Sequence, residues 1–370
     1  MEYKKIEELT TVVTGGTPKT SKSEYWDDGN IPWLQSGCCQ NCDVDSAEKY
    51  ITQVGYDNSS TRMMPPNTVM IALTGATAGK VGYLNFEACG NQSITGIFPC
   101  DKLNQRYLFF FLLSQRDKIL ADCVGGAQAH ISQGYVKNIV VPILSLQEQG
   151  EIVEVLTKLT DVINMRQNEM NLLDNLIKAR FVEMFGDPVA NDKEWTTLPL
   201  EEACTIIVDC PHSTPSYTME NTGFMCIRTS IVKKNRILWD DIEYIPEDEF
   251  IKRIQRKKPE VGDVVYTREG AILGIAAIID RECNVALGQR SMLLSPDADK
   301  CISEFLCVAM NCDSFLDNAL KGVAGSASPH INVGDIKSFK MIMPPIELQN
   351  QFADFVHQVN KSKVVLLSIK

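Results

Sequence analysis

The feature that most constrains what this chain can fold into is an internal repeat that runs through its length. The segment IEELTTVVTGGTP at Ile6 returns as LEEACTIIVDCPH at Leu200, and VPILSLQEQ at Val141 returns as MPPIELQNQ at Met343. The offset between the copies therefore grows from 194 to 202 residues. A slow increase of this offset is expected of a duplicated domain, because loops tolerate changes of length. We predict two equivalent domains in series.

Matched segments inside the copies predict the same strands and turns. NTVMIALTGATAGKVG returns as GDVVYTREGAILGIAA, so that Gly75 superposes on Gly270 and Gly79 on Gly274. The β-branched runs beside these glycines indicate short strands joined by turns. The segments YLFFFLLSQRDKIL and SEFLCVAMNCDSFLDNAL have helical spacing and predict one helix late in each copy. The fold class is therefore α+β, with two mixed α/β domains.

A heptad pattern follows each copy. Apolar residues recur every seven positions between 146 and 185, and a shorter apolar stripe follows the second copy. This pattern predicts a coiled-coil seam, with an amphipathic helix lying on a domain as the alternative. Gly186 and Pro188 form a helix stop signal. The predicted segments are domain 1 at 1–145, a spacer helix at 146–185, domain 2 at 186–345 and an apparently truncated second helix at 346–370.

Charge and cysteine content limit the possible partners and compartment. The net charge of −11 argues against a broad cationic DNA-binding face, so phosphates would be neutralised by local clusters or by partner proteins. The 13 cysteines show no disulfide-framework spacing, which favours reduced thiols. No apolar run is long enough to span a membrane. We expect a cytoplasmic protein with no membrane partner.

Motifs for catalysis are incomplete. The Pro-Pro pairs at 65–66 and 344–345 lack the polar and aromatic neighbours with which an amino-methyltransferase holds a flipped base. The turn from Gly75 to Lys80 has one residue too few between its glycines for a phosphate-binding loop, and a tight turn explains it equally well. Asp335-Ile336-Lys337 resembles part of a nuclease metal site, but the first copy has Tyr135 in place of the acid. We expect no catalytic residue.

Metal and histidine motifs are equally weak. Cys39 and Cys42 form one C-x-x-C beside Cys38, and without a second pair ordinary thiols are favoured over zinc. His130 and His330 fall at equivalent points of the repeat, which favours a shared structural role over catalysis. We expect neither a metal nor a cofactor.

The duplicated set of motifs resembles the specificity subunit of type I restriction-modification systems over the whole chain. The matching segments, in chain order, are GGTPKTSKSEYWDDGNIPWLQSG, TGATAGKVG, PILSLQEQ, DCPHSTP, REGAILG, LGQRSM and PPIELQNQ. The resemblance implies two target-recognition domains, each reading one half of a bipartite site in double-stranded DNA. It also implies that two antiparallel helices separate these domains.

In that family the helices set the gap between half-sites and dock the DNA adenine methyltransferase subunits, which use S-adenosylmethionine. An ATP-dependent translocase-nuclease subunit completes the restriction complex. The short second helix departs from this pattern and puts docking of a second methyltransferase in doubt. The subunit-interface residues predicted here are Leu156, Ile163, Arg166, Met170, Ile177, Arg180, Phe352, Phe355 and Val359.

Candidate DNA contacts are polar side chains on loops after predicted strands, since base edges are recognised by such donors and acceptors. For each, a solvated loop is the alternative. In the first copy the candidates are Lys19, Thr20, Ser21, Lys22, Gln35, Ser36, Gly37, Lys80 and Gln92. In the second copy they are His212, Ser213, Thr214, Arg228, Thr229, Ser230, Arg268, Gln289 and Arg290.

The densest basic cluster adds candidates for phosphate contacts, with a solvated helix face as an equal alternative. Its members are Lys252, Arg253, Arg256, Lys257 and Lys258. Because equivalent positions differ between copies, we expect an asymmetric target. A scaffold or inhibitor without its own DNA readout is the competing hypothesis, and a single-chain restriction or methylation enzyme is disfavoured by the incomplete motifs.

Overall fold

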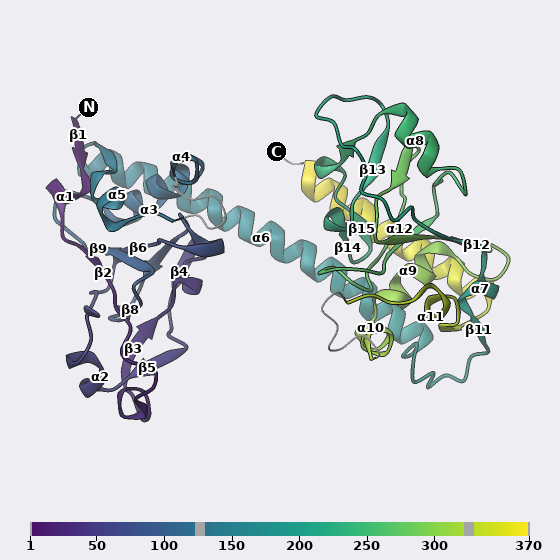
Figure 1. Cartoon of the computed structure of the whole chain (residues 1–370), viewed down its shortest axis with the longest axis horizontal. Helices are drawn as coiled ribbons and strands as arrows, with labels where there is room; N and C mark the ends of the chain where they lie inside the picture. The colour runs from purple at the N-terminus through teal and green to yellow at the C-terminus, as the bar shows by residue number, and fades with distance from the viewer. Residues whose placement is uncertain (1, 123–129, 322–328, 369–370) are drawn as a thin grey trace. The chain divides into compact units, whose positions relative to one another are not determined.

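The computed structural model describes residues 2–122, 130–321 and 329–368 (Figure 1). The chain divides into two compact units, Met1–Asn164 and Met165–Lys370. The division falls inside helix α6 (Leu146–Phe185), so each unit holds one copy of the repeat and part of this helix.

The first unit is built on a sheet in the order β2-β9-β6-β7-β4. Neighbouring strands are antiparallel except β4, which runs parallel to β7. The strands are β2 (Val12–Thr14), β4 (Cys42–Val44), β6 (Thr68–Ala72), β7 (Val81–Leu84) and β9 (Ile94–Ile97). Every residue of β6 and β7 is buried, so both faces of the sheet are covered.

Alternation along β6 directs its side chains into two cores. Val69 and Ile71 belong to the core shared with helix α3 (Gln105–Ser114), whereas Met70 and Ala72 belong to the core on the other face. A second sheet has the order β5-β3-β8, in which β3 is antiparallel to β5 and parallel to β8. Its strands are β3 (Ile31–Leu34), β5 (Lys49–Ile51) and β8 (Cys89–Gly90).

The remaining elements of the first unit are short. They are β1 (Glu2–Lys5), α1 (Ile6–Leu9), α2 (Gln53–Asp57), α4 (Arg116–Ala121), α5 (Gln133–Asn138) and β10 (Val140–Ile143). Strands β1 and β10 pair antiparallel, and β10 leads into α6. A capping box starts α6, because Ser145 Oγ accepts from Glu148 N at 3.2 Å and Glu148 Oε2 accepts from Ser145 N at 2.9 Å.

The second unit repeats this plan. Its main sheet has the order β12-β20-β17-β18, and a second sheet has the order β16-β13-β19, again with one antiparallel and one parallel pair. The strands are β11 (Thr197–Pro199), β12 (Cys204–Asp209), β13 (Met225–Ile227), β14 (Val232–Lys233), β15 (Arg236–Ile237), β16 (Glu243–Tyr244), β17 (Val264–Thr267), β18 (Ala276–Ile278), β19 (Val285–Leu287), β20 (Ser291–Pro296) and β21 (Lys340–Ile342).

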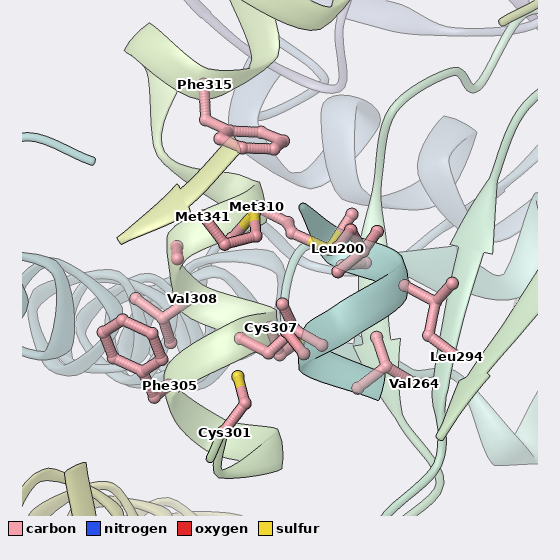
Figure 2. Close-up of a cluster of buried hydrophobic side chains, with 14 of the residues drawn as sticks. Leu200, Val264, Leu294, Cys301, Phe305, Cys307, Val308, Met310, Phe315 and Met341 are labelled. Carbon is pink, nitrogen blue, oxygen red and sulfur yellow. The ribbon is translucent and has the colours of Figure 1, made fainter. Parts of the chain in front are cut away.

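Helices complete the second unit. They are α7 (Leu200–Ala203), α8 (Glu247–Arg253), α9 (Ser303–Asn311), α10 (Asp313–Leu320), α11 (Val333–Lys337) and α12 (Ile346–Ser368). Figure 2 shows Leu200 of α7, Phe305 of α9, and Val264 and Leu294 of the sheet within one cluster of buried apolar side chains. Phe181 and Phe185, near the end of α6, complete this core.

Within the second unit, α12 runs antiparallel to the end of α6. The rings of Phe352 and Phe181 are 5.5 Å apart, and one turn further along α12 Phe355 lies under the Arg180 guanidinium. Further on, Lys363 Nζ lies 2.6 Å from Asp174 Oδ1. Residue numbers rise along α12 while those of the contacting residues of α6 fall, so the two helices are antiparallel. The predicted fold class, two mixed α/β domains with long helices in contact, is confirmed.

Two details of the sequence prediction were wrong. Each predicted late helix is divided in two, at Gln115 between α3 and α4 and at Cys312 between α9 and α10. The repeat offset also stops growing at 200, because α6 begins at Leu146 and α12 at Ile346. The predicted offset of 202 aligned similar residue types whose structural positions in the two copies differ by two residues.

Among the described residues, no helix combines the length and apolar character needed to cross a membrane.

Candidate nucleic-acid interface

Backbone hydrogen bonds bring the loops of the first copy together beyond the ends of its strands. Gly16 N donates to Gly90 O at 2.8 Å, Asn91 N to Leu34 O at 2.9 Å, and Leu73 N to Ser93 O at 2.8 Å. These bonds join the loops that follow β2, β3, β6 and β8, which we call the first loop cluster. At Gly15 a Cβ would lie 2.0 Å from Gly90 O, so this close approach requires glycine.

The second copy has the equivalent bonds. Gly288 N donates to Ile227 O at 2.8 Å, and Arg268 N donates to Arg290 O at 3.0 Å. Cys210 N donates to Ser291 O at 3.2 Å, which matches the bond from Gly15 N to Ile94 O at 3.1 Å in the first copy. The loops that follow β12, β13, β17 and β19 therefore form a second loop cluster with the same backbone plan.

One side-chain hydrogen bond also recurs in both clusters. Thr17 Oγ1 donates to Gln92 Oε1 at 2.5 Å, and Thr214 Oγ1 donates to Gln289 Oε1 at 3.1 Å. The bond leaves each glutamine amide group available for a further partner. Thr17 was not among the predicted contacts, although the repeated threonine was a signal for it.

The glycine turns also match. Gly75 and Gly79 each have φ of 73°, and their counterparts Gly270 and Gly274 have φ of 92° and 77°. The chain bridges back beside each turn, at Thr74–His130 and at Glu269–His330. The two histidines therefore occupy equivalent backbone positions in the two copies.

The predicted contacts of the first copy are mostly exposed. Lys19, Thr20, Ser21, Gln35, Gly37 and Gln92 are exposed, and Ser36 is half-buried. Lys22, although exposed, is paired with Glu24 at 3.2 Å and bonded to Tyr25 Oη at 3.0 Å, and together these hydrogen bonds raise its pKa. Lys80 is half-buried and donates to Gln40 at 2.6 Å. Lys19, Gln35 and Gln92 are therefore the exposed long side chains of this set besides Lys22.

The second cluster differs in its side chains. His212, Ser213, Thr214, Arg228, Ser230 and Arg290 are exposed, whereas Thr229 and Gln289 are half-buried. Arg228 pairs with Glu243 at 2.6 Å and lies 5.1 Å from the Tyr217 ring centre. Arg290 has φ of 73°, and its side chain forms no hydrogen bond or ion pair with any described residue.

Arg268 lies behind this surface. Its side chain is 6% exposed, and it is paired with Asp209 at 2.9 Å and with Glu269 at 2.8 Å. Asp209 also lies 3.1 Å from His212 Nε2. Arg268 therefore holds the loop from within, and Asp209, which the sequence prediction missed, connects it to the exposed His212.

Most of the basic cluster is neutralised by neighbouring carboxylates. Lys252 pairs with Asp248, Arg253 with Glu249 and Lys257 with Glu260, and the Arg253 side chain is only 1% exposed. Arg256 and Lys258 have neutral partners in the described structure, the carbonyl oxygen of Asp209 and the Asn284 side chain. Four of the five cations, Lys252, Arg253, Arg256 and Lys257, line a hollow of about 230 Å³.

The predicted subunit-interface residues fall into two groups. Ile177, Phe352 and Val359 are buried in the core of the second unit, and Phe355 is packed against that core. Ile163 is 66% exposed, whereas Leu156, Arg166, Met170 and Arg180 are half-buried. Arg166 and Arg180 pair with Glu169 and Glu183 on the same helix. On the heptad seam of α6, the exposed apolar residues Leu159 and Ile163 lie in its first half, whereas Leu172, Leu176 and Val182 in its second half are exposed off the seam.

Metal chemistry receives no support from the described part of the chain. There, no group of three His, Cys, Asp or Glu side chains is placed to hold a metal ion. Cys39 is buried and Cys42 exposed, and Asp335 accepts a hydrogen bond from Asn332 at 3.0 Å. What the two loop clusters offer is hydrogen-bond donors and acceptors on loops that backbone hydrogen bonds connect.

Comparison with known proteins identifies the family. A family model described as "Type I restriction modification DNA specificity domain" matches residues 1–174 and again residues 192–367. The chain therefore belongs to the type I restriction-modification specificity subunits and carries two target-recognition domains. Specificity subunits are the non-catalytic members of these systems.

Individual relatives agree with this assignment. The specificity subunit of Escherichia coli EcoR124I/EcoR124II is 30% identical over 169 residues, which are 44% of this chain and less than half, 42%, of that subunit. The MjaIX specificity subunit of Methanocaldococcus jannaschii is 23% identical over 398 residues, covering 99% of this chain and 89% of the relative.

Solved structures of the same kind cover the whole chain. The type I S subunit from M. genitalium matches with a TM-score of 0.48 and 16% identity, covering 100% of this chain and 93% of that one. The HsdS subunit from Thermoanaerobacter tengcongensis matches with a TM-score of 0.37 and 16% identity, covering 99% and 90%.

Proposed function

We propose that each loop cluster reads one half of an asymmetric, bipartite site in double-stranded DNA. The observation that carries this proposal is that two clusters share one backbone hydrogen-bond plan but present different side chains. Where the first copy has Ser93, the second has Arg290. A common scaffold with unequal donors is what recognition of two different half-sites requires.

The chemistry of the exposed side chains suits base edges. The free amide group of Gln92 can donate to the N7 or O6 edge of a purine, while an unpaired guanidinium such as Arg290 suits the O6 and N7 acceptors of guanine. Lys19, Thr20 and Ser21 would then contact sugar and phosphate, which orient a domain without specifying sequence.

The charge of the chain requires partners. With a net charge of −11, it would rely on DNA adenine methyltransferase subunits, docked on α6 and α12, for much of the phosphate contact. An ATP-dependent restriction subunit would join the same complex. A complex acting on chromosomal DNA would work in the cytoplasm, where we place the chain.

Mapping of methylated adenines in cells with and without the gene tests the proposal. We expect one bipartite motif to lose methylation on deletion, and the chain to co-purify with a methyltransferase. Co-purification with no lost motif would favour the scaffold or inhibitor hypothesis. Absence of both results, with no motif lost and no methyltransferase co-purified, would overturn the proposal.

A substitution can distinguish recognition of DNA bases by this chain from a role as a scaffold without DNA recognition. Arg290→Ser, which copies the first domain, should relax specificity in one half-site and leave the other half-site unchanged, because the other cluster is untouched. Lys234→Ser, in the same unit but paired with Asp313, is the control. Equal loss of methylation at all sequences would contradict base readout by Arg290.

A further inference from the structure

A buried glutamine occupies the first turn of each long helix. Gln149 is the fourth residue of α6 and Gln349 the fourth residue of α12, and both are 0% exposed. They lie 200 residues apart, in structural register. A fully buried amide side chain must find partners for its oxygen and its nitrogen within the protein.

Both glutamines find the same partners. Gln149 Oε1 accepts from Asn104 N at 2.7 Å, and its Nε2 donates to Leu144 O at 2.9 Å. Gln349 Oε1 accepts from Ile302 N at 2.9 Å, and its Nε2 donates to Pro344 O at 2.9 Å. A further bond from Nε2 reaches Lys102 O at 3.5 Å in the first copy and Lys300 O at 3.0 Å in the second.

These partners connect the long helix to the recognition domain. Asn104 is the N-cap of α3, and Ile302 precedes α9 in the same way. Helix α3 packs on β6 and β7, the strands whose turn belongs to the first loop cluster, and α9 packs on β18 and β20 of the second unit. Each glutamine is therefore connected to its loop cluster through one helix and the strands on which that helix packs.

Directional contacts distinguish this joint from ordinary packing. Apolar packing is non-directional, whereas hydrogen bonds to backbone groups on two different segments fix both the position and the rotation of a helical turn. At its other end, α6 is held by Phe181 and Phe185, whose rings lie 5.5 and 4.9 Å from that of Phe305 in the second unit.

We propose that Gln149 and Gln349 are positioning residues that fix the direction in which each long helix leaves its recognition domain, and thereby help to select the gap between half-sites. This inference rests on the proposed function. Loss of either glutamine would let the helix pivot, so that DNA with a neighbouring gap length would also be accepted.

The test measures gap preference in the assembled methyltransferase complex. Once methylation mapping gives the motif, duplexes are made with the native gap and with one base pair removed or added. Wild type is compared with Gln149→Leu, with Gln149→Glu, which keeps the acceptor but loses the donors, and with Gln147→Leu. Gln147 is exposed on the same helical turn and is the matched control.

We expect Gln149→Leu to reduce the ratio of methylation at native and altered gaps by about tenfold, which corresponds to the loss of about one hydrogen-bonded constraint. Gln149→Glu should show a smaller reduction, and Gln147→Leu should match wild type. If Gln149→Leu does not assemble, Gln149→Glu decides the test by the same ratio.

Two results would count against the proposal in different ways. An unchanged ratio in both Gln149 variants, or a loss of methylation that is equal for all gaps, would overturn the inference and leave the proposed function standing. Absence of any bipartite preference in wild type would overturn the proposed function and the inference with it.

Discussion

At the scale of single residues, the two copies place different chemistry on the same backbone. Leu73 O accepts from Ile131 N at 2.9 Å, and its counterpart Arg268 O accepts from Ile331 N at 2.8 Å. Both residues are buried, at 4% and 5% exposure. Because a buried guanidinium requires compensating charge, the second copy has Asp209 and Glu269 beside it.

Removing that guanidinium should destabilise the second unit. Arg268→Leu, which restores the residue type of the first copy, leaves Asp209 without its main partner and should cost about 3 kcal/mol. Adding Asp209→Asn should recover part of this loss. Urea unfolding followed by hydrogen exchange of peptides from β12 and β17 measures both effects, and additive losses would contradict a direct pairing.

Buried thiols predict a loss of stability at high pH. Burial raises the pKa of Cys89 from 9.0 to about 11 and that of Cys204 to about 12. Above pH 9 the unfolded chain ionises these thiols and the folded chain does not, so the free energy of unfolding falls with rising pH, by about 1.4 kcal/mol per pH unit and thiol. The fall ends as the pH passes the folded pKa values.

Urea unfolding at pH 8, 9 and 10 checks this dependence. Cys89→Ala with Cys204→Ala should give a shallower fall than wild type, whereas Cys42→Ser should not, because Cys42 is exposed. Parallel pH profiles for all three proteins would show that other groups control the fall.

At the scale of elements, long patterns were predictable and short interruptions were not. The forty residues of α6 match the predicted range 146–185 because the heptads continue to the Gly186 stop. The break at Cys312 was hidden, since apolar spacing continues through it while its backbone is extended at φ −61° and ψ 139°. The structural equivalence of Gln149 and Gln349 could not be predicted either, because residue types in the two copies match better when the alignment is shifted by two positions.

The exposed apolar residues on the heptad seam of α6 should form a docking surface for the proposed methyltransferase subunits. Leu159 and Ile163 lie on the heptad seam and are 53% and 66% exposed. Leu159→Asp with Ile163→Asp should abolish co-purification with the methyltransferase. Val182→Asp, on the same helix but off the seam and 53% exposed, should not. Retention by the seam variant would exclude this surface as the docking site.

At the scale of the whole chain, the sequence predicted where the two loop clusters lie better than which of their side chains are accessible. The duplicated motifs located both loop clusters. Arg268 was predicted as a contact yet is buried. Its ion pair with Asp209 could not be predicted from a local pattern, because the two residues lie 59 positions apart in the sequence. Arg253 is also buried, and its ion pair with Glu249 follows ordinary i, i+4 helical spacing, which a charge pattern alone could have indicated.

The acidity of the chain leads to a prediction about DNA affinity. Alone, it should bind its target weakly, with a shallow dependence on salt, because few cations are free to displace counterions from phosphates. Addition of methyltransferase subunits should strengthen binding and steepen the slope of log affinity against log salt. Fluorescence anisotropy with a labelled duplex from 50 to about 200 mM salt measures both quantities.

Variants at the basic cluster show which contacts belong to this chain. In the complex, Arg256→Gln and Lys258→Gln should each lower that slope by about 0.9, the contribution of one phosphate contact. Lys252→Gln should lower it less, because Lys252 is already paired with Asp248 at 3.0 Å. Equal slopes for all three variants and wild type would place the phosphate contacts elsewhere. Tight, salt-sensitive binding by the isolated chain would show that partner subunits are not needed to offset its charge.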